Sequence, residues 1–166
     1  MICIDIKAQQ DFPPFRRSPL DGYAFHASDT VGAGPESPVT LKVIAEVPAG
    51  SSFDGELPEG CAARLMTGAP VPDGADAVEK YESTQFNSDQ VKIFSEFRPG
   101  TNVVPKGEDY HEGDILIPEG TKLDPFCISV LAMLGITEAE VYRKPVVALI
   151  STGTELVPPS AEILGP

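Results

Sequence analysis

The sequence predicts an α+β chain that is mainly β. The chain has 15 Gly and 17 Pro among 166 residues, several short segments alternate apolar with polar side chains, and one segment has the spacing of an amphipathic helix. Frequent Gly and Pro interrupt long helices and favour short strands joined by tight turns. We therefore expect an irregular β architecture with one short helix.

The strands of the first hundred residues are expected to be short. Residues 40–47 (TLKVIAEV) show near alternation, and residues 57–65 cross a turn at their Glu-Gly pair. Residues 75–81 (ADAVEKY) and 91–97 (VKIFSEF) have strand composition and lie on either side of the turn-forming residues 87–89. The sequence predicts a hairpin between these two segments.

The single expected helix spans residues 125–134. Asp124 is a suitable N-cap, Pro125 fits the first helical position, and Gly135 follows the end. The helix should bury one apolar stripe against the core, formed by Phe126, Val130, Leu131 and Leu134.

Further strands are expected around this helix. Residues 115–117 form a brief strand before it, and residues 140–143 another after it. Residues 146–150 (VVALI) are apolar on both faces, as in a buried parallel strand, and lead to a Ser-Thr-Gly turn that would open a βα unit. Because a crossover helix and a partner strand need more residues than remain, we expect the chain to be a fragment.

Composition excludes several classes of function. The formal net charge of −13, with only 12 Lys and Arg, argues against binding to nucleic acid or to an anionic membrane surface. Cys3, Cys61 and Cys127 are odd in number and widely spaced, so we expect reduced thiols in the cytoplasm. No apolar run approaches the length of a membrane span, and we expect neither secretion nor membrane insertion.

Two stretches have the composition of binding loops, residues 18–24 (SPLDGYA) and residues 64–78 (RLMTGAPVPDGADAV). In the first, a Pro and a Gly hold Asp21 at a bend before an apolar segment. In the second, Thr67 starts a turn between the end of a strand and two prolines. Such turns often serve only the fold, and Asp21 could simply cap its own turn.

Together these stretches resemble the amino-terminal region of the MoeA family. Residues 12–16 (FPPFR), 107–109 (GED) and 151–156 (STGTEL) fit the same family, in the same order. Members of this family are molybdenum insertases, which transfer molybdate into adenylated molybdopterin with release of AMP. The resemblance implies that the chain is the amino-terminal part of such an enzyme and is inactive alone.

The resemblance also implies a layout in three parts. Residues 10–112 would form an irregular β-rich domain, inserted into a small α+β unit made of residues 1–9 and 113–144. Residues 145–166 would supply the first strand and loop of a truncated α/β domain.

The residues that match the family's functional positions are Asp21, Thr67, Asp109 and Glu155. The resemblance implies contacts of Asp109 and Glu155 with Mg²⁺ or with water at the pyrophosphate, a hydrogen bond from Thr67 to an oxyanion, and a place for Asp21 near the molybdate. It implies that the backbone and hydroxyls of Ser151, Thr152 and Gly153 contact molybdopterin. The family usually has Asp where this chain has Thr154.

The resemblance further implies a homodimer, with molybdopterin adenylyltransferase as the pathway partner. The alternative is a non-catalytic β module used for dimerisation or partner binding, since gephyrin-type relatives also act as scaffolds. Two other interpretations concern the histidines. The stretch with Asp109, His111, Glu112 and Asp114 is either a metal cluster or a solvated loop, and neither His26 nor His111 has a Ser or Cys at the spacing of a nucleophilic triad.

Overall fold

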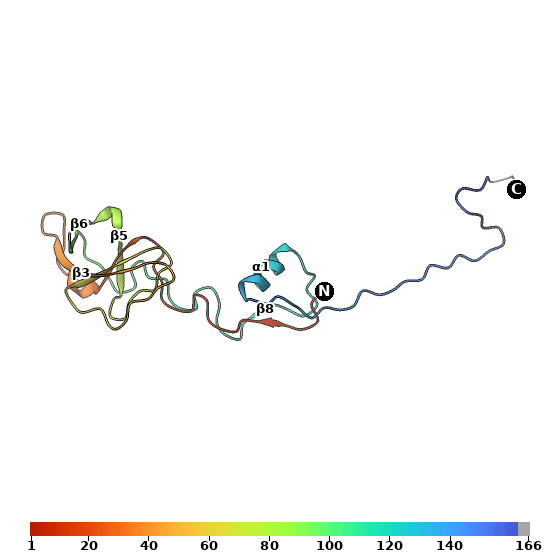
Figure 1. Cartoon of the computed structure of the whole chain (residues 1–166), viewed down its shortest axis with the longest axis horizontal. Helices are drawn as coiled ribbons and strands as arrows, with labels where there is room; N and C mark the ends of the chain where they lie inside the picture. The colour runs from red at the N-terminus through yellow and green to blue at the C-terminus, as the bar shows by residue number, and fades with distance from the viewer. Residues whose placement is uncertain (163–166) are drawn as a thin grey trace.

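The computed structural model describes residues 1–162. Figure 1 shows three parts in a row: a β-rich body, a small unit that contains the helix and the amino terminus, and an extended carboxy-terminal segment. The expected fold class, α+β and mainly β, is confirmed. Within these residues, no helix combines the length and apolarity needed to cross a bilayer.

A six-stranded curled sheet forms the body. Its order is β5-β2-β4-β3-β7-β6, and the β3–β4 pair is parallel while the other neighbours are antiparallel. The strands are β2 (Gly22–Phe25), β3 (Val39–Val47), β4 (Cys61–Leu65), β5 (Ala77–Lys80), β6 (Gln85–Asn87) and β7 (Gln90–Ile93), with single 3₁₀ turns η1 (Ala27–Thr30) and η2 (Tyr81–Ser83).

Strand β2 lies inside the body, and all four of its residues are buried. Its side chains alternate between two apolar clusters: Ala24 packs in one, while Tyr23 and Phe25 pack in the other. At Gly22 the strand approaches β5 so closely that a Cβ would overlap the carbonyl oxygen of Glu79. Glycine is therefore required at this position by the packing of two backbones.

The small unit consists of β1 (Ile6–Lys7), β8 (Ile115–Ile117) and α1 (Pro125–Met133). Strands β1 and β8 pair antiparallel, although more than a hundred residues separate them in sequence. The helix begins as predicted, because the Asp124 carboxylate accepts a hydrogen bond of 2.8 Å from the Cys127 N–H. It ends before Gly135, whose φ is +70°.

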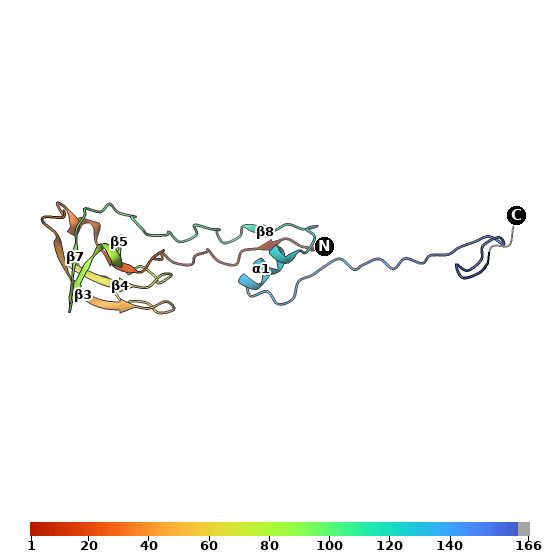
Figure 2. The ribbon, with the colours of Figure 1, turned by 90° about the horizontal axis from the view of Figure 1, so that it is seen from above.

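The packing core of this unit joins the amino terminus to residues more than a hundred positions later in the sequence. The core residues Ile2, Ile6, Ile117 and Leu131 are buried together. Two chain segments connect the unit to the body, and Figure 2 shows them running side by side. The division into separately folding domains at residues 112 and 113 stays a prediction.

The predicted hairpin between residues 75–81 and 91–97 is wrong. The turn lies where expected, with Ser88 at φ +60°, but it joins β6 to β7. Strand β5 pairs instead with β2 at the far edge of the sheet. Residues 85–87 show no apolar alternation and all three are exposed, so the pattern that identifies a half-buried strand was missing there.

The buried strand predicted at residues 146–150 is also wrong for this structure. These residues form no strand, and Val146 and Leu149 are each 98% exposed. A parallel strand is buried only when neighbouring strands pair with its edges and helices cover its faces, and within residues 1–162 no strand lies beside this run.

Two smaller expectations are corrected as well. Residues 140–143 make only an isolated bridge, between Ile2 and Val141. In the helix, Leu131 is buried and Val130 and Leu134 pack beside it, but Phe126 is 81% exposed. Phe126 lies in the first turn of the helix and is not part of the apolar cluster that buries Leu131.

Candidate functional site

Asp21 and Thr67 meet where β2 begins and β4 ends. The register pairs Gly22 with Leu65, so the residues just outside these strands lie next to each other. The Thr67 N–H and the Thr67 Oγ1 hydroxyl both donate to Asp21 Oδ1, at 2.6 and 2.7 Å. Gly68, with φ +84°, then turns the chain away. Two separate motifs therefore form one polar pair, although 46 positions separate its members.

The electrostatics of this pair favour an ionised carboxylate. The two hydrogen bonds from Thr67, and after them the nearby charge of Arg64, hold the pKa of Asp21 below its ordinary value. Both side chains are exposed, so the pair is accessible from solvent. Because Asp21 accepts both donors of Thr67, the hydroxyl must release Asp21 before it can donate to an oxyanion.

Sequence reasoning missed Arg64, which lies beside this pair. The register places Tyr23, Arg64 and Glu46 in one row across β2, β4 and β3. The Arg64 guanidinium lies 5.3 Å from the centroid of the Tyr81 ring and 3.7 Å from Glu46 Oε1. A signal was present, because Arg64 is a charged residue in an otherwise apolar strand that ends at the binding loop.

The Tyr81 ring beside this arginine belongs to an aromatic cluster. Tyr23 is fully buried and stacks between Tyr81 and Phe86, with centroid distances of 6.0 Å to each. Tyr81 and Phe86 are 43% and 41% exposed. The Tyr23 hydroxyl is buried and has no hydrogen-bond partner within residues 1–162. Burial raises the pKa of Tyr23, so the hydroxyl stays protonated.

Asp109 lies apart from this pair, in one of the two segments that connect the body to the small unit. Its N–H donates to the Phe12 carbonyl at 2.9 Å, and its side chain is exposed. Within residues 1–162 the Asp109 carboxylate makes no hydrogen bond or ion pair, and none joins it to Asp21 or Thr67. The backbone at Asp109 is held while the carboxylate stays free.

The last predicted site lies in the extended carboxy-terminal segment. Ser151, Thr152, Gly153 and Glu155 are all exposed. Gly153 has φ +138°, and the Glu155 carboxylate folds back over it. Both views show this segment at the opposite end of the molecule from the β-rich body (Figures 1 and 2). In this structure it does not join Asp21, Thr67 or Asp109.

The residues present do not form a magnesium site. Within residues 1–162, no three His, Cys, Asp or Glu side chains gather where one ion could bind them. Asp109 and Glu155, the predicted ligands, belong to segments that lie apart (Figure 1). In the 109–114 stretch, the Asp114 carboxylate instead accepts the His111 N–H at 2.8 Å.

Comparison with protein families identifies a match over residues 1–135, to the model described as the MoeA N-terminal region, domains I and II. Among curated proteins, the chain is similar to a molybdopterin molybdenumtransferase from Bacillus subtilis, with 43% identity over 157 residues, and to one from Staphylococcus aureus, with 40% identity over 153 residues. Each alignment covers 92% of this chain and 36% of the relative. The chain thus spans about a third of the length of these relatives.

Solved structures give the same result. A crystal structure of a molybdopterin biosynthesis MoeA protein from Pyrococcus horikoshii superposes with a TM-score of 0.87 at 41% identity, covering 98% of this chain and 41% of the other. A second structure from that organism superposes with a TM-score of 0.78 at 37% identity, over 83% of this chain.

Proposed function

Because the chain belongs to the family of MoeA amino-terminal regions, we propose that it is the amino-terminal part of a molybdenum insertase. The complete enzyme would transfer molybdate into adenylated molybdopterin and release AMP, in molybdenum cofactor biosynthesis. The single observation that carries this proposal is the Asp21–Thr67 pair, which two distant motifs build on the surface of a rigid sheet.

The pair suggests a division of roles. An ionised Asp21 repels a molybdate oxyanion, so we assign Asp21 to holding the Thr67 turn in place. Arg64 is the cation beside this pair, and its guanidinium is matched to oxyanion recognition. In this proposal Arg64 attracts the anionic substrate, and Thr67 presents its hydroxyl when the hydrogen bond to Asp21 opens.

The remaining site residues are proposed because they match functional positions of the family. Asp109 and Glu155 would contact Mg²⁺ or water at the pyrophosphate. Ser151, Thr152 and Gly153 would contact molybdopterin. Because these groups lie in separate parts of the chain, we propose that they meet only in the complete, assembled enzyme.

The assembly and location are proposals as well. We propose a homodimer whose site combines the β-rich region of one subunit with the α/β domain of the other, working in the cytoplasm. We propose molybdopterin adenylyltransferase as the partner that supplies the adenylated substrate.

The test is AMP release by the full-length protein with adenylated molybdopterin, molybdate and magnesium. We compare the wild type with Asp21→Ala at matched folding, with Asp54→Ala as the control, because Asp54 is exposed and distant in sequence from the site motifs. Asp21→Ala removes the acceptor of both Thr67 hydrogen bonds, so we expect a loss of about tenfold or more for this variant and none for the control. Equal release by all three proteins would contradict the role of Asp21.

A second function, a non-catalytic module for dimerisation or partner binding, is favoured by two partly exposed aromatic rings, Tyr81 and Phe86. Both rings stack on Tyr23, Tyr81 also lies beside Arg64, and Tyr and Arg are residues enriched at protein contacts. Unchanged AMP release in Asp21→Ala, together with weakened self-association in Tyr81→Ala, would favour this module over the insertase.

A further inference from the structure

Two segments form the neck between the body and the small unit, residues 8–13 and residues 104–114 (Figure 2). They run antiparallel, and the Phe12 N–H donates to the Tyr110 carbonyl at 2.9 Å. The Phe12 and Tyr110 rings stack with their centroids 5.5 Å apart and their planes 17° from parallel. The neck is therefore an ordered two-stranded connection, and Asp109 lies in it.

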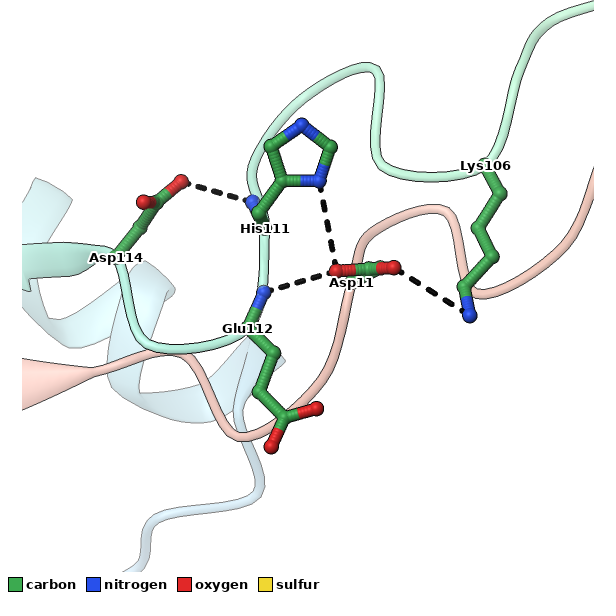
Figure 3. A network of polar contacts seen from close by, with 5 residues as sticks. All are labelled: Asp11, Lys106, His111, Glu112 and Asp114. Carbon is green, nitrogen blue, oxygen red and sulfur yellow. Dashed lines mark hydrogen bonds and ion pairs between the residues drawn. The ribbon is translucent and has the colours of Figure 1, made fainter.

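The Asp11 carboxylate cross-links this neck, as Figure 3 shows. Its Oδ1 accepts the Glu112 N–H at 2.9 Å and lies 3.5 Å from His111 Nδ1. Its Oδ2 lies 3.4 Å from Lys106 Nζ. Lys106 precedes Asp109 in the sequence, and His111 and Glu112 follow it. The Asp11 carboxylate therefore contacts both ends of the loop that contains Asp109.

Asp11 is the least exposed of the side chains in this network, as expected for a residue with a structural role. The Asp11 side chain is 24% exposed, whereas Lys106 and His111 are 58% and 69% exposed. The hydrogen bond from the Glu112 N–H, then the Lys106 contact, keeps the pKa of Asp11 below its ordinary value. The backbone hydrogen bond, at 2.9 Å, is the shortest of the three contacts and the only one of them within ordinary hydrogen-bond distance.

The loop itself has little freedom. Gly107 has φ +75°, and a Cβ there would lie 2.5 Å from the His111 ring. On the other side, the His111 N–H donates to Asp114 Oδ2 at 2.8 Å. The Asp109 N–H is held by the Phe12 carbonyl at 2.9 Å. These contacts fix the backbone of the loop, while the Asp109 carboxylate makes no hydrogen bond or ion pair within residues 1–162.

We propose that Asp11 is a positioning residue, which fixes the 106–112 loop so that Asp109 is presented at one place for the reaction. This inference rests on the proposed function, because it assigns Asp109 a part in that reaction. Asp11 itself contacts no substrate in the proposed reaction and acts only by positioning the loop. A displacement of about 1 Å at a reacting group can cost on the order of a hundredfold in rate.

The first experiment is a double-mutant cycle in the full-length protein, read out as AMP release at matched folding. We expect Asp11→Ala to lower kcat by about 10- to 100-fold with little change in KM for molybdate. In the Asp109→Ala background, the same substitution should cost less than about twofold, since Asp109 is no longer there to be positioned. Glu108→Gln is the matched control, because it removes a charge from the same exposed loop.

Wild-type kinetics in Asp11→Ala would overturn the proposal, as would an undiminished loss in the Asp109→Ala background. The second experiment is hydrogen exchange at the backbone amides of Asp109 and Glu112. Asp11→Ala should raise their exchange rates at least tenfold relative to Glu108→Gln, and unchanged rates would overturn the proposal even without an activity assay. If Asp109→Ala leaves AMP release intact while Asp11→Ala raises the exchange rates, Asp109 has no role in the proposed function. Asp11 would then fix the loop without a part in the reaction.

Discussion

Two stretches that the sequence predicts as binding loops share a Thr-Gly pair, at residues 67–68 and 152–153, but differ in structural support. Thr67 follows β4, and Asp21 precedes the neighbouring strand β2, so each polar side chain is held by a strand in a six-stranded sheet. Residues 151–155 follow an apolar run that makes no strand, and they are exposed throughout. A turn sequence becomes a defined site only when the elements that flank it are paired.

The difference arises from the cost of ordering the backbone. Fixing one residue costs about 1 to 2 kcal/mol in conformational entropy, which burial and paired hydrogen bonds must offset. Around Asp21 and Thr67, the fully buried side chains of Tyr23 and Leu65 supply that burial. Around Glu155, no such burial occurs within the described residues.

The largest expected effect is destabilisation of the β-rich body by Gly22→Ala. The new Cβ would overlap the Glu79 carbonyl of the neighbouring strand, and neither backbone can move without breaking the sheet. We expect destabilisation of about 4 kcal/mol or more, measured by urea unfolding. Gly34→Ala is the control, because the nearest atom to its new Cβ lies 4.0 Å away. Equal stability of both variants would show that the strands separate easily.

The same truncation made in both regions sharpens the comparison. Leu65 is fully buried and Leu149 is 98% exposed. We expect Leu65→Ala to cost about 3 kcal/mol of the free energy of unfolding and Leu149→Ala less than about 0.5 kcal/mol. A large cost at Leu149 in this chain would mean that residues 146–150 pack in solution, which would contradict the comparison.

The smallest expected effect concerns the titration of Asp21. Thr67→Val removes the hydroxyl donor and keeps the N–H donor, so the pKa of Asp21 should rise while staying below its ordinary value. The measurement is an NMR titration of the Asp21 carboxyl carbon. Thr121→Val is the control, because its hydroxyl donates to the Pro118 carbonyl.

The sign of the pH dependence follows from the same contacts. Because the folded pKa of Asp21 is lowered, its contribution to stability is present above the ordinary value of 3.8 and is lost as the pH falls through the folded pKa. The Thr67→Val protein should therefore lack part of that contribution at neutral pH, and its stability should fall less steeply as the pH is lowered. An Asp21 pKa unchanged by the substitution would show that the hydroxyl does not contribute to this contact.

Local chemistry could be predicted from the sequence wherever neighbouring residues determine it. The N-cap at Asp124, the helix end at Gly135 and the strand at Ile115–Ile117 lie where predicted, because capping and turn geometry depend on a few adjacent residues. The bends at Asp21 and Thr67 belong to the same class. Residues 85–87 were missed because an exposed edge strand has no apolar pattern.

By itself, then, the sequence determined the mainly β class, the turns and the family. Only the tertiary structure decided which strands pair, that Asp21 binds Thr67, and that Asp11 reaches Lys106 and Glu112. Local preferences act over a few residues, whereas the contacts of Asp21 with Thr67 and of Asp11 with Glu112 join groups 46 and 101 positions apart. Their partners are selected by packing of the whole chain, which no short motif encodes.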